Sequence, residues 1–134
     1  MVSELMRAKN AHLMSRASTY EATHGVLAIS AITVFEISQG LHQMARVTQA
    51  QNFRRWIEAW DVFPLARDTM QLAGEIGGKM MKAGRVIGLA DTCIAATALE
   101  QGRILVTGNT RHFEYVREVG FALELDNWRE PTPP

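Results

Sequence analysis

Residues 90–108 read ADTCIAATALEQGRILVTG. Small and apolar side chains dominate up to Gln101, which favours a helix that ends at Gly102. The following residues 104–107 form an apolar run between two glycines, as is typical of a strand that is buried on both faces. A helix that leads into such a strand predicts an α/β fold with a largely parallel sheet.

The rest of the chain continues this alternation. Ser30 can cap a helix, because its hydroxyl accepts an early backbone amide. We expect one domain over residues 1–128 and a disordered tail over 129–134, where Pro131, Pro133 and Pro134 gather. Further strands are predicted at 25–29, 62–63 and 121–125, and helices at 31–44, 48–60, 67–83 and 90–101.

Composition excludes several classes of protein. The 134 residues are 47% hydrophobic and 21% charged, with 14 basic and 14 acidic side chains. A neutral chain is a poor candidate for tight non-specific nucleic-acid binding, which needs many contacts from Lys and Arg to phosphates. No apolar run is long enough to cross a membrane, so we expect a cytoplasmic protein. The lone Cys93 excludes a disulfide framework and is expected to be a small buried residue.

Two carboxylates fall among apolar residues. Glu36 lies four residues from Ile32 on the expected helix, and Asp91 aligns with Ile94 and Ala98. A carboxylate in such surroundings needs a partner, and two of them in one cleft could hold Mg²⁺ or Mn²⁺, which prefer oxygen ligands. Two alternatives stay open: Asp91 could be a helix N-cap, and Glu36 could be half exposed beside the apolar stripe.

Polar residues follow the buried strand at 104–107. Asn109 and Thr110 stand where ligands usually bind in open α/β sheets, and could contact a phosphate or an attacking water. They could equally form a turn and cap the next helix. His112 is expected to be a surface or helix-start histidine. Four arginines could line a path for RNA: Arg85, Arg103, Arg111 and Arg117.

Three blocks of the sequence resemble the PIN-domain ribonucleases of the VapC and FitB toxin type. The first is GLADTCIAATALEQG at 88–102, and the second is TGNTRHF at 107–113. The third is ISAITVFEISQG at 29–40, similar to the family's Ser-x-x-Thr-x-x-Glu-x-x-x-Gly pattern. In the family's order, the resemblance extends from residue 2 to residue 128.

The resemblance implies an α/β/α sandwich with a central, mostly parallel sheet. It also implies the toxin of a type II toxin–antitoxin system, an endoribonuclease that depends on Mg²⁺ or Mn²⁺ and cleaves RNA, with tRNA as the expected substrate. A cognate antitoxin and a homodimer are the expected partners. Position by position, Glu36 and Asp91 become metal-binding catalytic acids. Asn109 takes the fourth position, where it would orient the attacking water.

The start of the chain departs from the family pattern. Members of this family open with an apolar strand that ends in Asp-Thr-Asn-Val, whereas Met1 stands here at the position of that valine. The expected first catalytic aspartate and one central strand therefore precede the printed sequence. Either the reading frame starts late, which we favour, or the protein is a catalytically inactive remnant that only binds an antitoxin or itself.

Overall fold

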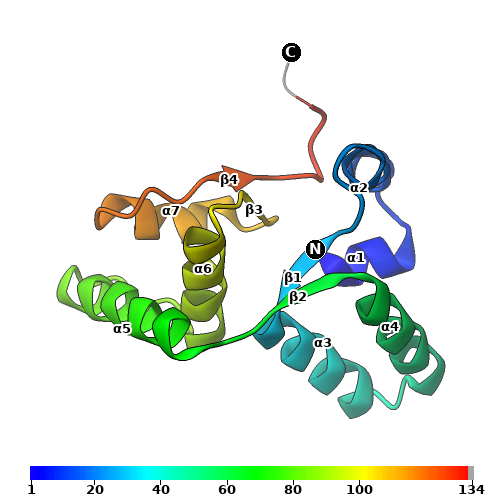
Figure 1. The fold of residues 1–134 in the computed structure, drawn as a ribbon, viewed down its shortest axis with the longest axis horizontal. Helices are drawn as coiled ribbons and strands as arrows, with labels where there is room; N and C mark the ends of the chain where they lie inside the picture. The colour runs from blue at the N-terminus through cyan, green and yellow to red at the C-terminus, as the bar shows by residue number, and fades with distance from the viewer. Residues whose placement is uncertain (133–134) are drawn as a thin grey trace. The chain divides into compact units, whose positions relative to one another are not determined.

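The computed structural model describes residues 1–132 as two compact units (Figure 1). The first unit comprises Met1–Pro64 with residues 128–132, and the second comprises Leu65–Asn127. None of the helices in residues 1–132 combines the length and apolar character that a membrane crossing requires.

The first unit places helices around a short parallel strand pair. Ser30 caps α3 as predicted, because its hydroxyl accepts the backbone N–H of Ile32 at 3.3 Å. The two strands pair in register from Ala28 opposite Asp61 to Ser30 opposite Phe63. The elements are α1 (Val2–Arg7), α2 (Ala11–His24), β1 (Ala28–Ser30), α3 (Ala31–Gln43), α4 (Val47–Ala59) and β2 (Asp61–Phe63).

Helix α2 was not expected from the sequence. Its start is fixed by Asn10, whose side-chain oxygen accepts the backbone N–H of Leu13 at 3.0 Å. Leu13 and Ala17 lie four residues apart and are almost fully buried, whereas most of the remaining side chains on the helix are polar. A stripe of so few apolar residues is a weak periodic signal, although Asn10 was a usable helix-start signal.

The second unit combines three helices with another parallel strand pair. Leu105 lies opposite Leu125, and Val106 lies opposite Asp126. The elements are α5 (Arg67–Lys82), α6 (Leu89–Gln101), β3 (Leu105–Val106), α7 (Thr110–Glu118) and β4 (Leu125–Asp126). Parallel strands separated by helices confirm the predicted α/β class.

The strand predicted at 121–125 is wrong for most of its length. Only Leu125 belongs to β4, and residues 121–124 are irregular. The N–H of Leu123 bonds the carbonyl of Phe121 at 2.9 Å, a tight turn that prevents extended pairing. Leu123 is nevertheless only 1% exposed, so its apolar character reflects burial in the core.

The core of the second unit lies where α5 packs on α6. Ile76 and Met80 of α5 and Ala95 of α6 are at most 1% exposed. Thr69 is also buried, and its hydroxyl donates to Glu100 Oε1 at 2.7 Å, which satisfies a polar group inside the contact. Cys93 is buried and forms no disulfide, as expected, and burial raises the pKa of its thiol.

Residues near the C-terminus pack within the first unit. The Trp128 ring lies 5.7 Å from that of Tyr20, measured between centroids. The Arg129 guanidinium forms a two-pronged ion pair with the Glu4 carboxylate, with Nε donating to Oε2 at 2.9 Å. Arg129, which the sequence placed in a disordered tail, therefore has a defined partner. Pro133 and Pro134 of that expected tail lie outside the described residues.

We expect Glu4→Gln to lower the free energy of unfolding by about 1 kcal/mol at pH 7. The side-chain bond from Arg129 lowers the pKa of Glu4 from its ordinary value of 4.5. A lowered folded-state pKa stabilises the protein above about pH 4.5, and this stabilisation is lost as pH falls through the folded value. Urea unfolding at several pH values should show the difference between the two proteins shrinking on acidification. Glu58→Gln, at an exposed position on α4, is the control, and a pH-independent difference would contradict the assignment.

Candidate functional site

Asp91 lies in the first turn of α6. The N-cap of this helix is Gly88, so the alternative that Asp91 is itself the cap is wrong. Its carboxylate is about one-third exposed, at 33%, while Ala95 on the next turn is fully buried. A carboxylate near a helix N-terminus interacts favourably with the helix dipole. The position therefore presents a charged oxygen donor at the surface of an otherwise apolar helix.

Asn109 connects β3 to α7. Its backbone N–H donates to the Thr107 hydroxyl at 3.1 Å, which forms a short turn directly after the strand. Asn109 is the N-cap residue of α7, but its side chain makes no capping bond. The predicted turn is thus present, whereas capping by this side chain is not. The exposed amide of Asn109 stays available to a ligand at the carboxyl end of β3.

His112 is the site residue that the sequence did not reveal. Its Nε2 atom lies 3.0 Å from Oδ2 of Asp91, and the two side chains are 28% and 33% exposed. The expected helix-start position is correct, since His112 occupies the first turn of α7. The packing of α7 against α6 brings His112 to Asp91. Twenty residues separate the two in the sequence, so no local pattern indicates that they are in contact. The neighbouring Phe113, 4% exposed, anchors this turn of α7 in the core.

Glu36 belongs to the first unit and lies in the middle of α3. The Glu36 side chain is exposed, and no residue of α3 is fully buried. Exposure agrees with the alternative that Glu36 stands beside the stripe. That Glu36 and Asp91 share one ion stays a prediction.

The Asp91 carboxylate is an oxygen donor of the kind that divalent cations prefer. Within residues 1–132, no three His, Cys, Asp or Glu side chains are grouped closely enough to hold a metal by themselves. Mg²⁺ is usually bound through one or two carboxylates and keeps several waters, so a full protein cage is not required. Asp91 Oδ2 and His112 Nε2 contact each other directly at 3.0 Å, and the Asp91 carboxylate remains partly exposed.

The arginines proposed to line an RNA path have different surroundings. Arg85 lies over the Tyr115 ring at 4.2 Å and pairs with Glu118 at 3.8 Å, so it is held against α7. Arg111 lies in the first turn of α7, directly before His112, and is exposed. Arg111 therefore has the better position of the two to contact a phosphate near Asp91.

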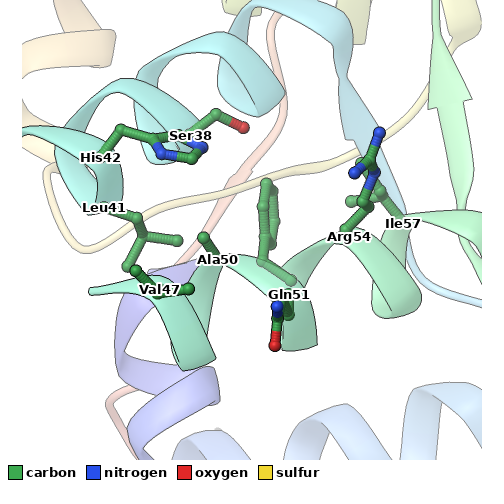
Figure 2. Close-up of a pocket in the computed structure, with 9 residues that line it drawn as sticks. Ser38, Leu41, His42, Val47, Ala50, Gln51, Arg54 and Ile57 are labelled. Carbon is green, nitrogen blue, oxygen red and sulfur yellow. The ribbon is translucent and has the colours of Figure 1, made fainter. Parts of the chain in front are cut away.

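A groove of about 430 Å³ runs between α3 and α4 in the first unit (Figure 2). Apolar side chains dominate its lining, with Leu41 from α3 and Val47 and Ile57 from α4. Polar groups of Ser38, His42, Gln51 and Arg54 also border it. Val47 is 64% exposed, an unusually open position for a large apolar side chain.

Comparison with known proteins gives a consistent picture. A model of the PIN domain matches residues 2–119. The chain is 30% identical over 115 residues to ribonuclease VapC2 of Haemophilus influenzae, covering 83% of this chain and 82% of that protein. It is also 30% identical over 111 residues to the tRNA(fMet)-specific endonuclease VapC of Shigella flexneri, covering 81% and 80%. The solved structure of VapBC-1 from nontypeable Haemophilus influenzae matches with a TM-score of 0.81 at 22% identity, over 96% of this chain and 93% of that one.

Proposed function

The chain belongs to the PIN-domain family with the VapC ribonucleases, and from this premise we propose that it is a toxin that cleaves RNA with the help of Mg²⁺ or Mn²⁺. The observation that carries the proposal is the partly exposed Asp91 carboxylate, which caps no helix and has a second donor, on His112, 3.0 Å away. A partly exposed carboxylate that is not used to cap a helix is open to a divalent ion, which can assist phosphodiester hydrolysis.

Each proposed site residue has a distinct task. Asp91 and Glu36 would hold the ion, which supplies Lewis acidity at the cleaved phosphate. Asn109 would orient the attacking water through its side-chain oxygen, which is a hydrogen-bond acceptor. Arg111 would contact a phosphate of the substrate as a charged donor. An N-terminal extension by the family's strand ending in Asp-Thr-Asn would contribute a further carboxylate.

The names of the relatives support RNA as the substrate, and we propose tRNA as the class of RNA that is cleaved. The Shigella relative is named for cleavage of initiator tRNA, and the two Haemophilus relatives are named ribonucleases. We expect the protein extended by the strand that ends in Asp-Thr-Asn to cleave total tRNA only when Mg²⁺ or Mn²⁺ is present. Chelation of the metal should stop this cleavage. Cleavage that persists in the presence of a chelator would contradict the metal-dependent function. Binding of an antitoxin without any cleavage would favour the inactive-remnant alternative.

The groove between α3 and α4 is the proposed docking site for an apolar helix of the cognate antitoxin. Its apolar lining suits a helix that inserts side chains at regular spacing, with His42 and Arg54 at the border for polar contacts. The fold matches a chain in the VapBC-1 structure over 96% of this protein, which supports an antitoxin as a partner, and the groove is assigned to it from the apolar lining alone. The homodimer stays a prediction of the resemblance.

We expect Val47→Glu to weaken antitoxin binding by at least about 10-fold, because a carboxylate in an apolar contact must be desolvated without a partner. Val86→Glu is the matched control, since Val86 is similarly open at 76% exposure but lies in the second unit. Titration calorimetry with the purified antitoxin measures both variants. Equal affinities for the two variants would place the docking site elsewhere.

A further inference from the structure

Arg85 lies in the second unit, where α5 has ended and the segment that leads to Asp91 begins. Its backbone N–H donates to the carbonyl of Met80 at 2.8 Å, directly after Gly84, whose φ is 71°. This is the Schellman arrangement that commonly ends a helix. Met80 is almost fully buried, so the backbone of Arg85 is fixed against the core of the unit.

The guanidinium of Arg85 is held against α7. Its central carbon lies 4.2 Å from the centre of the Tyr115 ring, a spacing typical of a cation–π contact. Val116, next to Tyr115, is fully buried, which fixes this turn of the helix. Stacking uses the flat face of a guanidinium, whereas its N–H donors point outward in the plane of the group. A phosphate can therefore be bound at the edge of the guanidinium while the stack on Tyr115 is kept.

The contact of Arg85 with Glu118 is too long to be a hydrogen bond. Arg85 Nη2 lies 3.8 Å from Glu118 Oε2, and the two side chains are 46% and 57% exposed. Ion pairs with this exposure contribute little to stability. A phosphate can accept two parallel N–H bonds from an arginine, which is a stronger interaction. The guanidinium thus has more to gain from an anionic ligand than it has from Glu118.

The stack of Arg85 on Tyr115 lies beside Asp91 along one face of α7. Tyr115 follows His112 by three residues, so their side chains are neighbours on this face, about 4.5 Å apart along the helix axis. His112 in turn contacts Asp91 directly at 3.0 Å. Arg85 is therefore close to the proposed cleavage site without being one of its acids.

We propose that the Arg85 guanidinium, held by Tyr115, binds a phosphate of the RNA that flanks the phosphate cleaved at Asp91. This inference rests on the proposed cleavage of RNA and names a residue that positions the substrate. Because the guanidinium is already held in place, little side-chain freedom is lost when the phosphate binds. Such a contact fixes the position of the strand and does not select its bases.

RNA binding measured without cleavage tests the proposal. Labelled tRNA is titrated with protein in the presence of a chelator, and fluorescence anisotropy is followed at several salt concentrations. We expect Arg85→Ala to weaken binding by about 5-fold or more and to reduce the slope of log Kd against log salt by about 0.7 to 0.9, the loss of one phosphate contact. Arg67→Ala removes the same charge from an 85% exposed position of the same unit and should leave the slope unchanged. A purely structural role of Arg85 would lower stability without changing the slope.

Substitutions of the two neighbours test how the guanidinium is held. Tyr115→Leu removes the ring and should weaken binding by about 3-fold, whereas Tyr115→Phe keeps the ring and should stay within about 2-fold of the unaltered protein. Glu118→Gln removes a competing carboxylate and should tighten binding by about 2- to 3-fold. This gain should disappear when Arg85 is also replaced by alanine. An equal gain in both backgrounds would show that Glu118 acts independently of Arg85 and would contradict the assignment.

The outcomes separate this inference from the proposed function. Circular dichroism checks that all variants are folded. If the unaltered protein binds tRNA and Arg85→Ala has the affinity and the salt slope of Arg67→Ala, Arg85 does not contact the RNA, and the proposed cleavage of RNA stands. If the unaltered protein binds no tRNA at any of the salt concentrations, the proposed RNA substrate is wrong and the role of Arg85 falls with it.

Discussion

Asp91→Asn should lower metal-dependent RNA cleavage by at least about 100-fold in the protein extended by a strand that ends in Asp-Thr-Asn. Groups that only support a metal ligand from outside typically change affinity or activity by about 10- to 100-fold, and a ligand itself should contribute more. The amide has nearly the shape of the carboxylate but lacks its charge, so the ion is bound weakly and positioned poorly. Asp91 caps no helix, so the stability that its replacement costs is limited to the interaction with the helix dipole and the partly exposed contact with His112.

Asp68→Asn is the matched control for this substitution. Asp68 also lies in the first turn of a helix, α5 of the same unit, so the same favourable interaction with a helix dipole is lost. Its side chain is 74% exposed and its pairing with Arg67 is a surface contact of small energy. Initial rates on total tRNA with Mg²⁺ or Mn²⁺ are compared at equal concentrations of folded protein. Similar rates for the Asp91 and Asp68 variants would show that Asp91 is not a catalytic metal ligand.

The parts of the fold that the sequence predicted well are those in which local pattern and burial agree. Helix α6 and the strand after it were predicted within about two residues, because Gly102 adopts a left-handed conformation at the helix end, as its position suggested. Ser30 likewise marked the start of α3 through a side-chain bond that depends on neighbours in the sequence alone.

The parts that failed depend on tertiary contacts. Residues 121–125 alternate like a strand, but a turn at Phe121 leaves only Leu125 in the ladder with β3. Their apolar residues reflect burial, which strands and irregular core segments share. The same limit applies to Glu36, whose place in an apolar pattern suggested burial, whereas the side chain is exposed. Periodicity predicts which face of a helix is apolar, and not what covers that face.

The sequence singled out Asp91, whereas the contact of Asp91 with His112 appears only in the structure. Asp91 could be singled out because a carboxylate among small apolar residues is rare enough to need a reason. His112 has no such contrast, since a histidine in the first turn of an exposed helix is ordinary. Only the packing of α7 on α6 brings its Nε2 atom to Asp91. Short sequence motifs identify site residues that lie on the same helix or loop. A pair of residues on two different helices, such as Asp91 and His112, can be recognised only in the structure.

Adding an apolar strand that ends in Asp-Thr-Asn ahead of residue 1 should raise metal-dependent cleavage of tRNA by at least about 100-fold over residues 1–134. Within residues 1–132, no three His, Cys, Asp or Glu side chains lie close enough together to hold a metal ion. Mg²⁺ binds weakly to a site with fewer than three such ligands. The added aspartate supplies another carboxylate. The added strand also has backbone partners, because the described strands form two separate parallel pairs and each pair has an unpaired edge.

A second extension, identical except that it ends in Asn-Thr-Asn, separates the effect of the added carboxylate on activity from the effect of the added strand. Both extended proteins should unfold at higher urea concentration than residues 1–134, because both can add a strand to a sheet edge. Only the form that ends in Asp-Thr-Asn should cut RNA rapidly, since the amide is a poorer ligand for Mg²⁺. Rates on total tRNA with Mg²⁺ or Mn²⁺ are measured for the three proteins at equal folded concentration. If residues 1–134 cut as fast as the form ending in Asp-Thr-Asn, the first aspartate is dispensable and the proposed site needs no upstream ligand. If the two extensions are equally active, the strand restores activity through folding alone, and the proposed third carboxylate is wrong.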